Sequence, residues 1–211
     1  AVVVSDTHSV PAVDGKPFTI PDLDLEMLWC PPGTFVMGSP TTEAGRVGSE
    51  IQHQVTLTKG FYLGKYEVTQ AQWGQVMGTN PSFFKGTNRP VEKVIWTEVN
   101  AFCEKLTETE RTAGRLPAGM AYQLPTEAQW EYACRAGTTT AFSFGDELTA
   151  KDANFDRKGG ETIKVGKYPA NAWGFHDMHG NVLEWTADRY GNYPTGAVSA
   201  VSDPVGPAAG S

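Results

Sequence analysis

Apolar residues recur at helical spacing over residues 97–113. The stripe falls at positions i, i+3, i+4 and i+7 of a helix, a spacing that places the side chains on a single face. Its members are Val99, Phe102, Cys103 and Leu106. This pattern predicts a helix whose apolar face packs against the core.

Two further helices are predicted by capping boxes, in which a threonine and the glutamine three residues later bond each other's backbone N–H groups. The first box is formed by Thr69 and Gln72, and the second by Thr126 and Gln129. The helix after Thr126 is expected to end at Gly137, because glycine readily adopts the left-handed conformation that terminates helices. The chain is therefore expected to contain about three helices.

Short apolar and alternating segments predict strands in the first third of the chain. Residues 25–37 are expected to form two short strands separated by a Pro-Pro-Gly turn. Residues 52–58 alternate polar and apolar side chains, and residues 61–68 continue with strand-forming residues. Residues 1–24 show no periodicity, so we expect an extended N-terminal arm followed by one domain over residues 25–211.

Composition favours a folded, loop-rich domain. The 211-residue chain is 40% hydrophobic and 11% aromatic, which is enough apolar material for a core. Its 23 Gly and 14 Pro residues follow no fixed period, so we expect irregular backbone held by large aromatic anchors. The expected anchors are Trp73, Trp96, Trp130 and Trp185. His53 stands apart from other candidate residues and is expected to lie in solvent.

Charge and hydropathy argue against two classes of partner. The chain has 17 Lys and Arg against 24 Asp and Glu, a formal net charge of −7, whereas nucleic-acid binding requires clustered basic residues. No apolar run of about 18 residues is present, so no membrane span is expected. The chain starts at Ala1 rather than Met, which favours an exported protein in the periplasm or the extracellular space.

The segment from Asp177 to Glu184 is the strongest candidate binding site. Asp177 and Glu184 supply carboxylates, and Gly180 allows a sharp turn in which nearby carbonyl groups converge. Calcium takes six to eight oxygen ligands at flexible spacing, which suits such a segment. The alternative is an ordinary turn in which Asp177 and Asn181 bond their own backbone.

A histidine pair in the same segment is a weaker candidate. His176 and His179 lie three residues apart, but a transition-metal site would need a third ligand on the same face. We therefore expect one of them to be packed and the other to lie at the surface. The sequence contains neither a Gly-x-Ser-x-Gly nucleophile elbow nor a phosphate-binding loop.

Six segments, in one unbroken order between residues 25 and 207, resemble the formylglycine-generating-enzyme (sulfatase-modifying factor) family. They are Phe35–Ser39, Tyr66–Trp73, Arg89–Trp96, Tyr122–Gly137, Ala153–Phe155 and Gly174–Asp188. The resemblance implies an α+β fold, the variant of the C-type lectin fold that this family adopts. That fold is loop-rich, with about three helices and small twisted sheets.

The resemblance also bears on the cysteines. In active members of the family, two cysteines in a later segment bind copper and, with oxygen, convert a substrate cysteine of a sulfatase into formylglycine. None of Cys30, Cys103 and Cys134 matches those positions, and we expect the C-terminal part of the domain, with its catalytic cysteines, to be missing from this chain. The resemblance instead implies that Cys103 and Cys134 form disulfides with that later segment.

Calcium is the cofactor that the resemblance implies for the residues present. The implied ligands of the first site are Asp177, Gly180, Val182 and Glu184, with the glycine and the valine contributing backbone carbonyls. Asn154 and Phe155 match part of a second calcium site of the family, and Asp156 is the candidate carboxylate for it.

Three functions remain open on the sequence alone. The first is a calcium-stabilised binding or scaffold module with an unknown protein or glycan ligand, and it is the one that we favour. The second is a copper-dependent formylglycine-generating oxidase, which requires that the chain continue with a cysteine pair. The third is an accessory subunit of a larger extracellular assembly.

Overall fold

The centre of the fold is a five-stranded antiparallel sheet with the strand order β2-β3-β6-β1-β7. The computed structural model describes residues 1–6, 15–155, 160–193 and 200–208. The strands of this sheet are β1 (Val3–Asp6), β2 (Phe18–Ile20), β3 (Leu25–Cys30), β6 (Phe61–Gly64) and β7 (Met120–Gln123). A smaller sheet has the order β4-β5-β8. It consists of β4 (Gly33–Met37), β5 (His53–Leu57) and β8 (Val201–Ser202).

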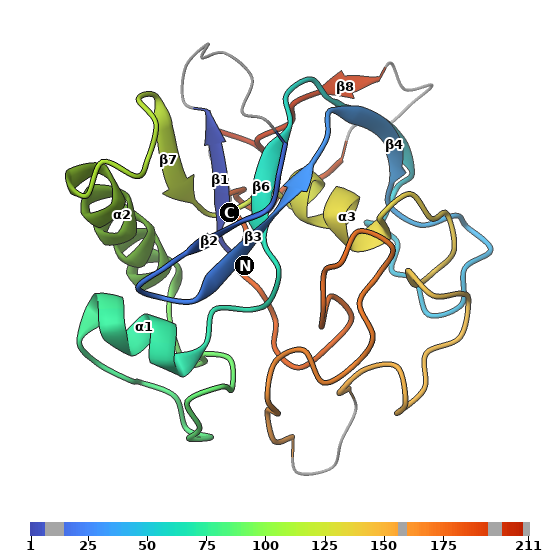
Figure 1. The fold of residues 1–211 in the computed structure, drawn as a ribbon. Coiled ribbons are helices and arrows are strands. Elements are labelled where there is room, and N and C mark those ends of the chain that lie inside the picture. Colours follow the sequence, from blue (N-terminus) through green and yellow to red (C-terminus); the bar gives the residue numbers. More distant parts are fainter. Residues whose placement is uncertain (7–14, 156–159, 194–199, 209–211) are drawn as a thin grey trace.

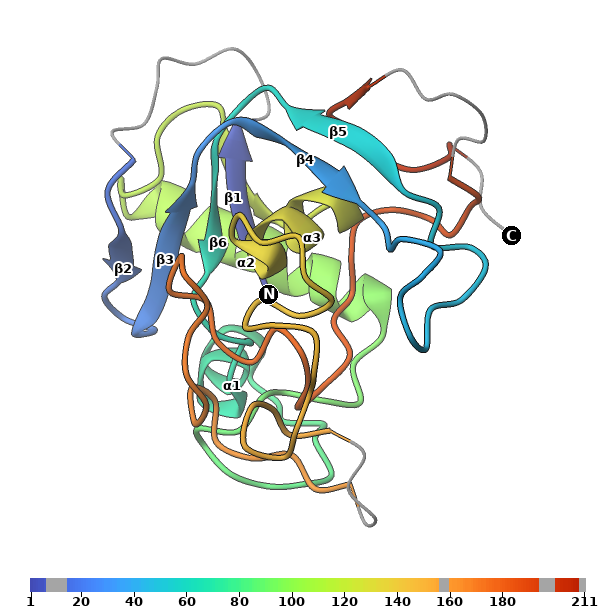
Figure 2. The same cartoon turned by 90° about the vertical axis from the view of Figure 1, so that its right-hand side faces the viewer.

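Helices cover both faces of the five-stranded sheet (Figures 1 and 2). The described residues contain α1 (Gln70–Met77), α2 (Trp96–Thr112) and α3 (Glu127–Arg135). Helices α1 and α2 pack on one face, whereas α3 packs on the other face and beneath the arch of β4 and β5. The prediction of three helices in an α+β fold is confirmed.

Both predicted capping boxes are present, and they fix where α1 and α3 begin. The N–H of Thr69 donates to Gln72 Oε1 at 2.9 Å, and the N–H of Thr126 donates to Gln129 Oε1 at 2.9 Å. The chain leaves α3 through Ala136, whose φ of 47° is left-handed, and then through Gly137. The predicted stop of this helix is therefore confirmed, although the alanine already begins the reversal.

The predicted apolar stripe of α2 lies in the core. Phe102 and Leu106 are fully buried, and Phe102 stacks on Trp73 of α1 with the ring centroids 5.2 Å apart. Burial of a large aromatic side chain contributes about 1.5–3 kcal/mol relative to its exposure, so this pair anchors both helices to the sheet.

The first residues of the chain do not form a separate arm. β1 lies inside the five-stranded sheet, where Val3 pairs with Leu63 of β6 and with Gln123 of β7. Val2 and Val4 join the core beside α2, whereas Val3 joins the core beside α3. A strand that is covered on both faces lacks polar alternation, so its sequence carries no periodicity to detect. Residues 7–14 of the predicted arm lie outside the described residues.

The expectation that four tryptophans anchor the core is wrong for two of them. Trp73 is buried, and Trp130 packs partly buried against the core beside α3. Trp96 and Trp185 are instead 40% and 47% exposed. Their indole N–H groups donate to Thr186 O and Val94 O at 2.9 and 3.0 Å, so they cross-link two loops at the surface.

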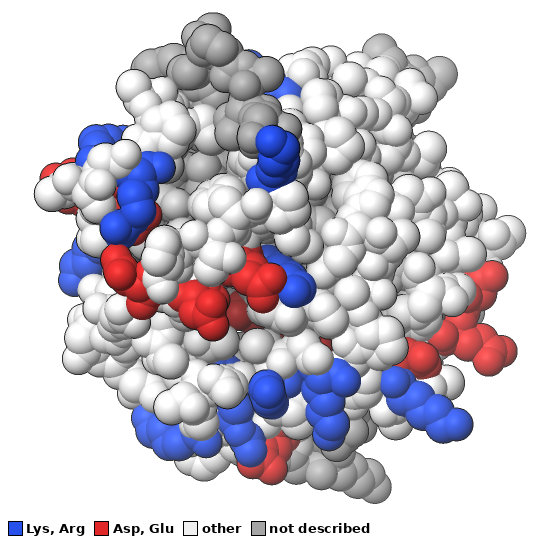
Figure 3. All heavy atoms as spheres, viewed as in Figure 1, with Lys and Arg blue, Asp and Glu red and all other residues white. Residues whose placement is uncertain are grey.

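No described helix is both long and apolar enough to cross a bilayer. Charged side chains of both signs lie in small groups on the face shown in Figure 3, and between them lie wide uncharged areas.

The position of β1 can be tested by shortening a single side chain. Val3 is fully buried, whereas Val36 on β4 is 45% exposed. Val3→Ala should therefore lower the free energy of unfolding by about 2 kcal/mol, because it leaves a cavity between packed layers. Val36→Ala should change it by less than about 0.5 kcal/mol. Urea unfolding of both variants measures the difference, and equal small effects would contradict an internal β1.

Candidate functional site

The loop over residues 177–184 is held in shape by two residues in the left-handed region. Asp177 has a φ of 58° and Asn181 a φ of 67°, conformations that short polar side chains tolerate. Gly180 allows the closest approach to another segment, because a Cβ at this position would lie 2.6 Å from the carbonyl oxygen of Asn154. The two segments that the sequence marked as calcium sites therefore pack against each other.

Asn181 connects this loop to its surroundings. Its backbone N–H donates to Asn154 O at 2.8 Å, and its side-chain amide donates to Glu67 Oε2 at 2.8 Å. Its side-chain oxygen accepts from the N–H of Ile163 at 2.9 Å and from Asn154 Nδ2 at 3.3 Å. One side chain thus joins three segments that have no regular secondary structure at these positions.

The predicted calcium ligands line the same hollow, but the carboxylates of Asp177 and Glu184 have different hydrogen-bond partners. The hollow measures about 650 Å³ and is lined by all the described candidates. These are Asn154, Phe155, Asp177, Gly180, Val182 and Glu184. Asp177 Oδ2 accepts from the N–H of Gly166 at 2.6 Å, whereas Glu184 accepts from Trp130 Nε1 at 3.2 Å and contacts the amino group of Ala1. Asp156 lies outside the described residues.

Three buried oxygen atoms near this loop have no hydrogen-bond donor in the structure. They are Asp177 Oδ1, Asn154 Oδ1 and Glu67 Oε1. A buried polar atom without a partner costs about 1–3 kcal/mol, so such a group requires an explanation. Oxygen atoms of carboxylates and amides are the ligands that calcium prefers. Asp177 and Asn154 line the same hollow, so their two orphaned oxygens fit a calcium ion.

Burial also raises the pKa values of the two carboxyl groups. The pKa of Glu67 is raised to about 8, first by burial and then by the neighbouring charge of Asp177. The pKa of Asp177 is raised by burial, against the opposing hydrogen bond from Gly166. No three His, Cys, Asp or Glu side chains in the described ranges form a group that could hold a metal ion. A cation here would therefore depend on backbone and amide oxygens as well.

The histidines of this loop serve in packing. His179 packs edge-on against the stacked rings of Phe142 and Phe144, each with its centroid 5.3 Å away, and its Nε2 accepts from the N–H of Ser143 at 3.0 Å. Burial lowers the pKa of His179 to about 4, so the ring is neutral at physiological pH. His176 packs on Tyr66 and bonds Tyr168 O through Nδ1 at 2.8 Å.

The three cysteines are free and buried. Cys103 belongs to the core beside α2, whereas Cys30 and Cys134 belong to the core beside α3. Burial raises the pKa of each thiol, to about 12 for Cys103 and Cys134. The predicted disulfides of Cys103 and Cys134 with a later segment stay a prediction.

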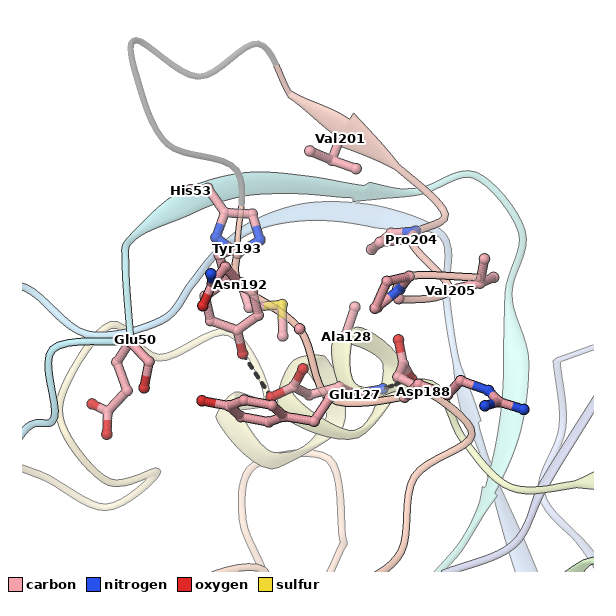
Figure 4. A pocket seen from close by; sticks show the side chains of 17 residues that line it. Glu50, His53, Glu127, Ala128, Asp188, Asn192, Tyr193, Val201, Pro204 and Val205 are labelled. Atoms are coloured by element: carbon pink, nitrogen blue, oxygen red, sulfur yellow. Dashed lines mark hydrogen bonds between the residues drawn. The ribbon is translucent and has the colours of Figure 1, made fainter. Parts of the chain in front are cut away.

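A second cavity, of about 460 Å³, lies above the first turn of α3 and was not predicted (Figure 4). Asp188 Oδ2 accepts from the N–H of Glu127 at 2.6 Å, and the hydroxyl of Tyr193 donates to Glu127 Oε1 at 2.6 Å. The expectation that His53 lies in solvent is wrong, because its ring is buried against Tyr193 with the centroids 4.7 Å apart. The lining comes from β4, β5, α3 and residues 188–193 and 201–207, so no local pattern could have revealed it.

Comparisons with known proteins agree with this architecture. Residues 17–205 match the family described as the sulfatase-modifying factor enzyme 1-like domain. The structure of PvdO from Pseudomonas aeruginosa is 29% identical with a TM-score of 0.71, covering 90% of this chain and 82% of that one. Treponema denticola variable protein 1 is 27% identical with a TM-score of 0.76, covering 92% and 84%. The fold is thus the α+β, loop-rich variant of the C-type lectin fold, and the chain belongs to the sulfatase-modifying factor family.

Relatives with named functions are of more than one kind. The chain is 34% identical over 176 residues to the chaperone protein LppX of Paenibacillus barcinonensis, and the match covers 62% of each chain. It is 30% identical over 173 residues to the formylglycine-generating enzyme of Mus musculus, a match covering 75% of this chain and 41% of the mouse protein. The chain thus spans less than two thirds of either relative.

The close packing at Gly180 predicts a large effect of one methyl group. Gly180→Ala would place Cβ against the Asn154 carbonyl, which belongs to the backbone and cannot swing away. Overpacking of this kind costs about 1–3 kcal/mol, and each kcal/mol lowers Tm by about 2–4 °C in a domain of this size. Gly48→Ala is the matched control, because nothing lies within 4 Å of its Cβ position. Thermal unfolding curves that coincide for the two variants would refute the packing of the two segments.

The buried carboxyl group of Glu67 predicts a pH dependence. Its pKa rises from 4.5 to about 8 on folding, so between these values the folded chain retains a proton that the unfolded chain has released. Below its unfolded pKa, Glu67 therefore does not reduce the free energy of unfolding. As the pH rises toward its folded pKa, burial of this carboxyl group reduces that free energy progressively.

In calcium-free buffer, Glu67→Gln should flatten the pH dependence of the free energy of unfolding across that window. Urea unfolding at several pH values measures this, with Glu92→Gln as a control at a partly exposed carboxylate. Parallel pH curves for the wild type and Glu67→Gln would contradict the assignment.

Proposed function

We propose that this domain is a calcium-stabilised binding or scaffold module that acts without redox chemistry of its own cysteines. The observation that carries the proposal is the cavity above α3, whose walls are fixed by hydrogen bonds between Glu127, Asp188 and Tyr193. Cavities of about 300–1,000 Å³ with a mostly apolar lining and a few fixed polar groups are typical of ligand sites.

Calcium would stabilise the irregular half of the module. The proposed protein ligands are the carboxylates of Asp177 and Glu184 and the carbonyls of Gly180 and Val182, with Asn154 and Phe155 in a second position. The orphaned oxygens of Asp177 and Asn154 support this role directly. Bound calcium supplies positive charge to oxygens that otherwise lack a partner, and the protein residues fix the loop around it.

An exported location accompanies this role. Extracellular calcium modules bind the ion with Kd values on the order of 10⁻⁴–10⁻³ M, which the calcium outside cells can saturate. A mixed set of carboxylates and carbonyls, as proposed for this loop, suits that range. Membership of a larger assembly remains compatible with the exposed Trp96 and Trp185, although no partner is identified by them.

The oxidase alternative is less well supported. Such chemistry needs a cysteine pair, and Cys30, Cys103 and Cys134 do not match the positions that the resemblance implies for it. The activity in the name of the mouse relative therefore stays with that protein.

Calcium dependence of thermal stability tests the module. A ligand that binds only the folded state stabilises it by RT ln(1 + [L]/Kd), which is about 2.7 kcal/mol at a hundredfold excess over Kd. Calcium should therefore raise Tm by several degrees over protein in EDTA, since each kcal/mol corresponds to about 2–4 °C. Magnesium at the same concentration should do much less, because it demands near-ideal octahedral geometry.

Asp177→Asn should abolish most of this shift, whereas Asp146→Asn, at an exposed carboxylate, should retain it. Differential scanning calorimetry of the three proteins provides the measurement. An unchanged Tm of the wild type in calcium and in EDTA would eliminate calcium from the proposal.

A further inference from the structure

The cavity above α3 is lined by three acidic residues. Glu50, Glu127 and Asp188 come from the loop before β5, from the first turn of α3 and from the segment after the 177–184 loop. Figure 4 shows Glu50 and Tyr193 on one side, Asp188 and Pro204 on the other, and Glu127 below. Within the described part of the chain, no ion pair joins these three carboxylates to a lysine or arginine. The negative charges of Glu127 and Asp188 are therefore not matched by an ion pair among the described residues.

The hydrogen bonds of these carboxylates fix them without removing their charge. Glu50 accepts from the hydroxyl of Ser39 at 2.5 Å, Glu127 from Tyr193, and Asp188 from the N–H of Glu127. Arg189 also lines the cavity, but its side chain is exposed to solvent. The charge in the cavity is therefore fixed in place, as in a preorganised electrostatic site.

The pKa of the Tyr193 hydroxyl group is raised in this environment. Its pKa is raised first by burial, then by the hydrogen bond to Glu127, and further by the charges of Glu127, Glu131 and Asp188. Burial opposes a charge of either sign, but the charges of Glu127, Glu131 and Asp188 disfavour a negative charge in particular. An anionic ligand is disfavoured for the same reason.

The start of α3 does not reverse this preference. A helix N-terminus attracts anions through its free N–H groups. Here the N–H of Glu127 is bonded to Asp188, and the N–H of Gln129 is bonded to the hydroxyl of Thr126. The partial positive charge of the helix is therefore already matched by the protein's own oxygen atoms.

The remaining walls are apolar and aromatic. Tyr190 and Val205 are 73% and 71% exposed, and they stand with Tyr193 and two prolines around the cavity. Exposed tyrosine faces attract cations through the ring quadrupole, and the effect grows as the cation loses water. The combination of a negative floor and aromatic walls matches a ligand with a positive end and an apolar body.

We propose that this cavity binds an organic cation, namely a primary ammonium or guanidinium group carried on a short apolar or aromatic body. The carboxylates of Glu127 and Asp188 pair with the charge, and Tyr190 and Tyr193 enclose the body. The inference rests on the proposed binding function and names its ligand class. The group can belong to a free amine or to a lysine or arginine side chain of another protein, because both present the same chemistry.

Three matched probes test the charge preference by calorimetric titration of the calcium-loaded domain. Phenylethylamine, phenylethanol and phenylacetate share one ring and differ in charge. We expect phenylethylamine to bind most tightly and phenylacetate least tightly, with a difference that shrinks as salt is added. Equal affinities, or a preference for phenylacetate, would overturn the ligand class while leaving a binding module in place.

Variants locate the binding. Asp188→Asn and Glu127→Gln keep their hydrogen-bond acceptors and lose their charges, so each should weaken phenylethylamine binding by about tenfold without changing phenylethanol binding. Glu108→Gln on the exposed side of α2 should have no effect on either probe. Unchanged amine affinity in both cavity variants would overturn the proposed site.

The source of the cation is distinguished by titrating agmatine and a blocked lysine peptide beside phenylethylamine. Tighter binding of the peptide indicates a protein side chain, and tighter binding of the free amines indicates a small molecule. Failure of every probe would overturn the inference alone, since calcium stabilisation of the domain is read independently from its Tm.

Discussion

The irregular half of this domain depends on Asn181. Loops without a ladder of backbone hydrogen bonds must satisfy their polar groups in other ways, and buried groups left unsatisfied are costly. Asn181 meets this demand for the segments around residues 67, 154 and 163 through both ends of its amide and through its backbone N–H. Because Glu67 follows β6 closely, the same side chain ties the loops to the five-stranded sheet.

Two pairs of acidic residues differ in their environments. Glu67 and Asp177 are buried and retain oxygens without donors, so they favour either protonation or a bound cation. Glu127 and Asp188 have donors and border a cavity with aromatic walls. Asp177 belongs to the proposed calcium loop, whereas Glu127 and Asp188 border the cavity of the proposed ligand. This division of roles is what a stable module with an adaptable binding face requires.

The sequence predicted those elements whose signals are local. Capping boxes at Thr69 and Thr126 and the stripe through Phe102 located the helices, because these patterns act within one or two turns. β1 was not predicted, because a strand between two layers has apolar residues on both faces and shows no alternation. The cavity above α3 was not predicted for a different reason. Its walls come from β5, α3 and residues 188–193 and 201–207, which only the tertiary fold brings together. The left-handed conformation of Asn181 likewise depends on contacts with distant segments.

Terbium luminescence distinguishes a 177–184 loop that binds a cation from one that does not. Terbium takes the same oxygen ligands as calcium and emits when a nearby tryptophan is excited. Trp130 bonds Glu184 through its indole N–H and lines the same hollow as Asp177, so it is placed to sensitise the ion. The account predicts sensitised emission that calcium displaces and that Trp130→Phe largely removes. Absence of emission from folded protein, or emission that calcium does not displace, would contradict it.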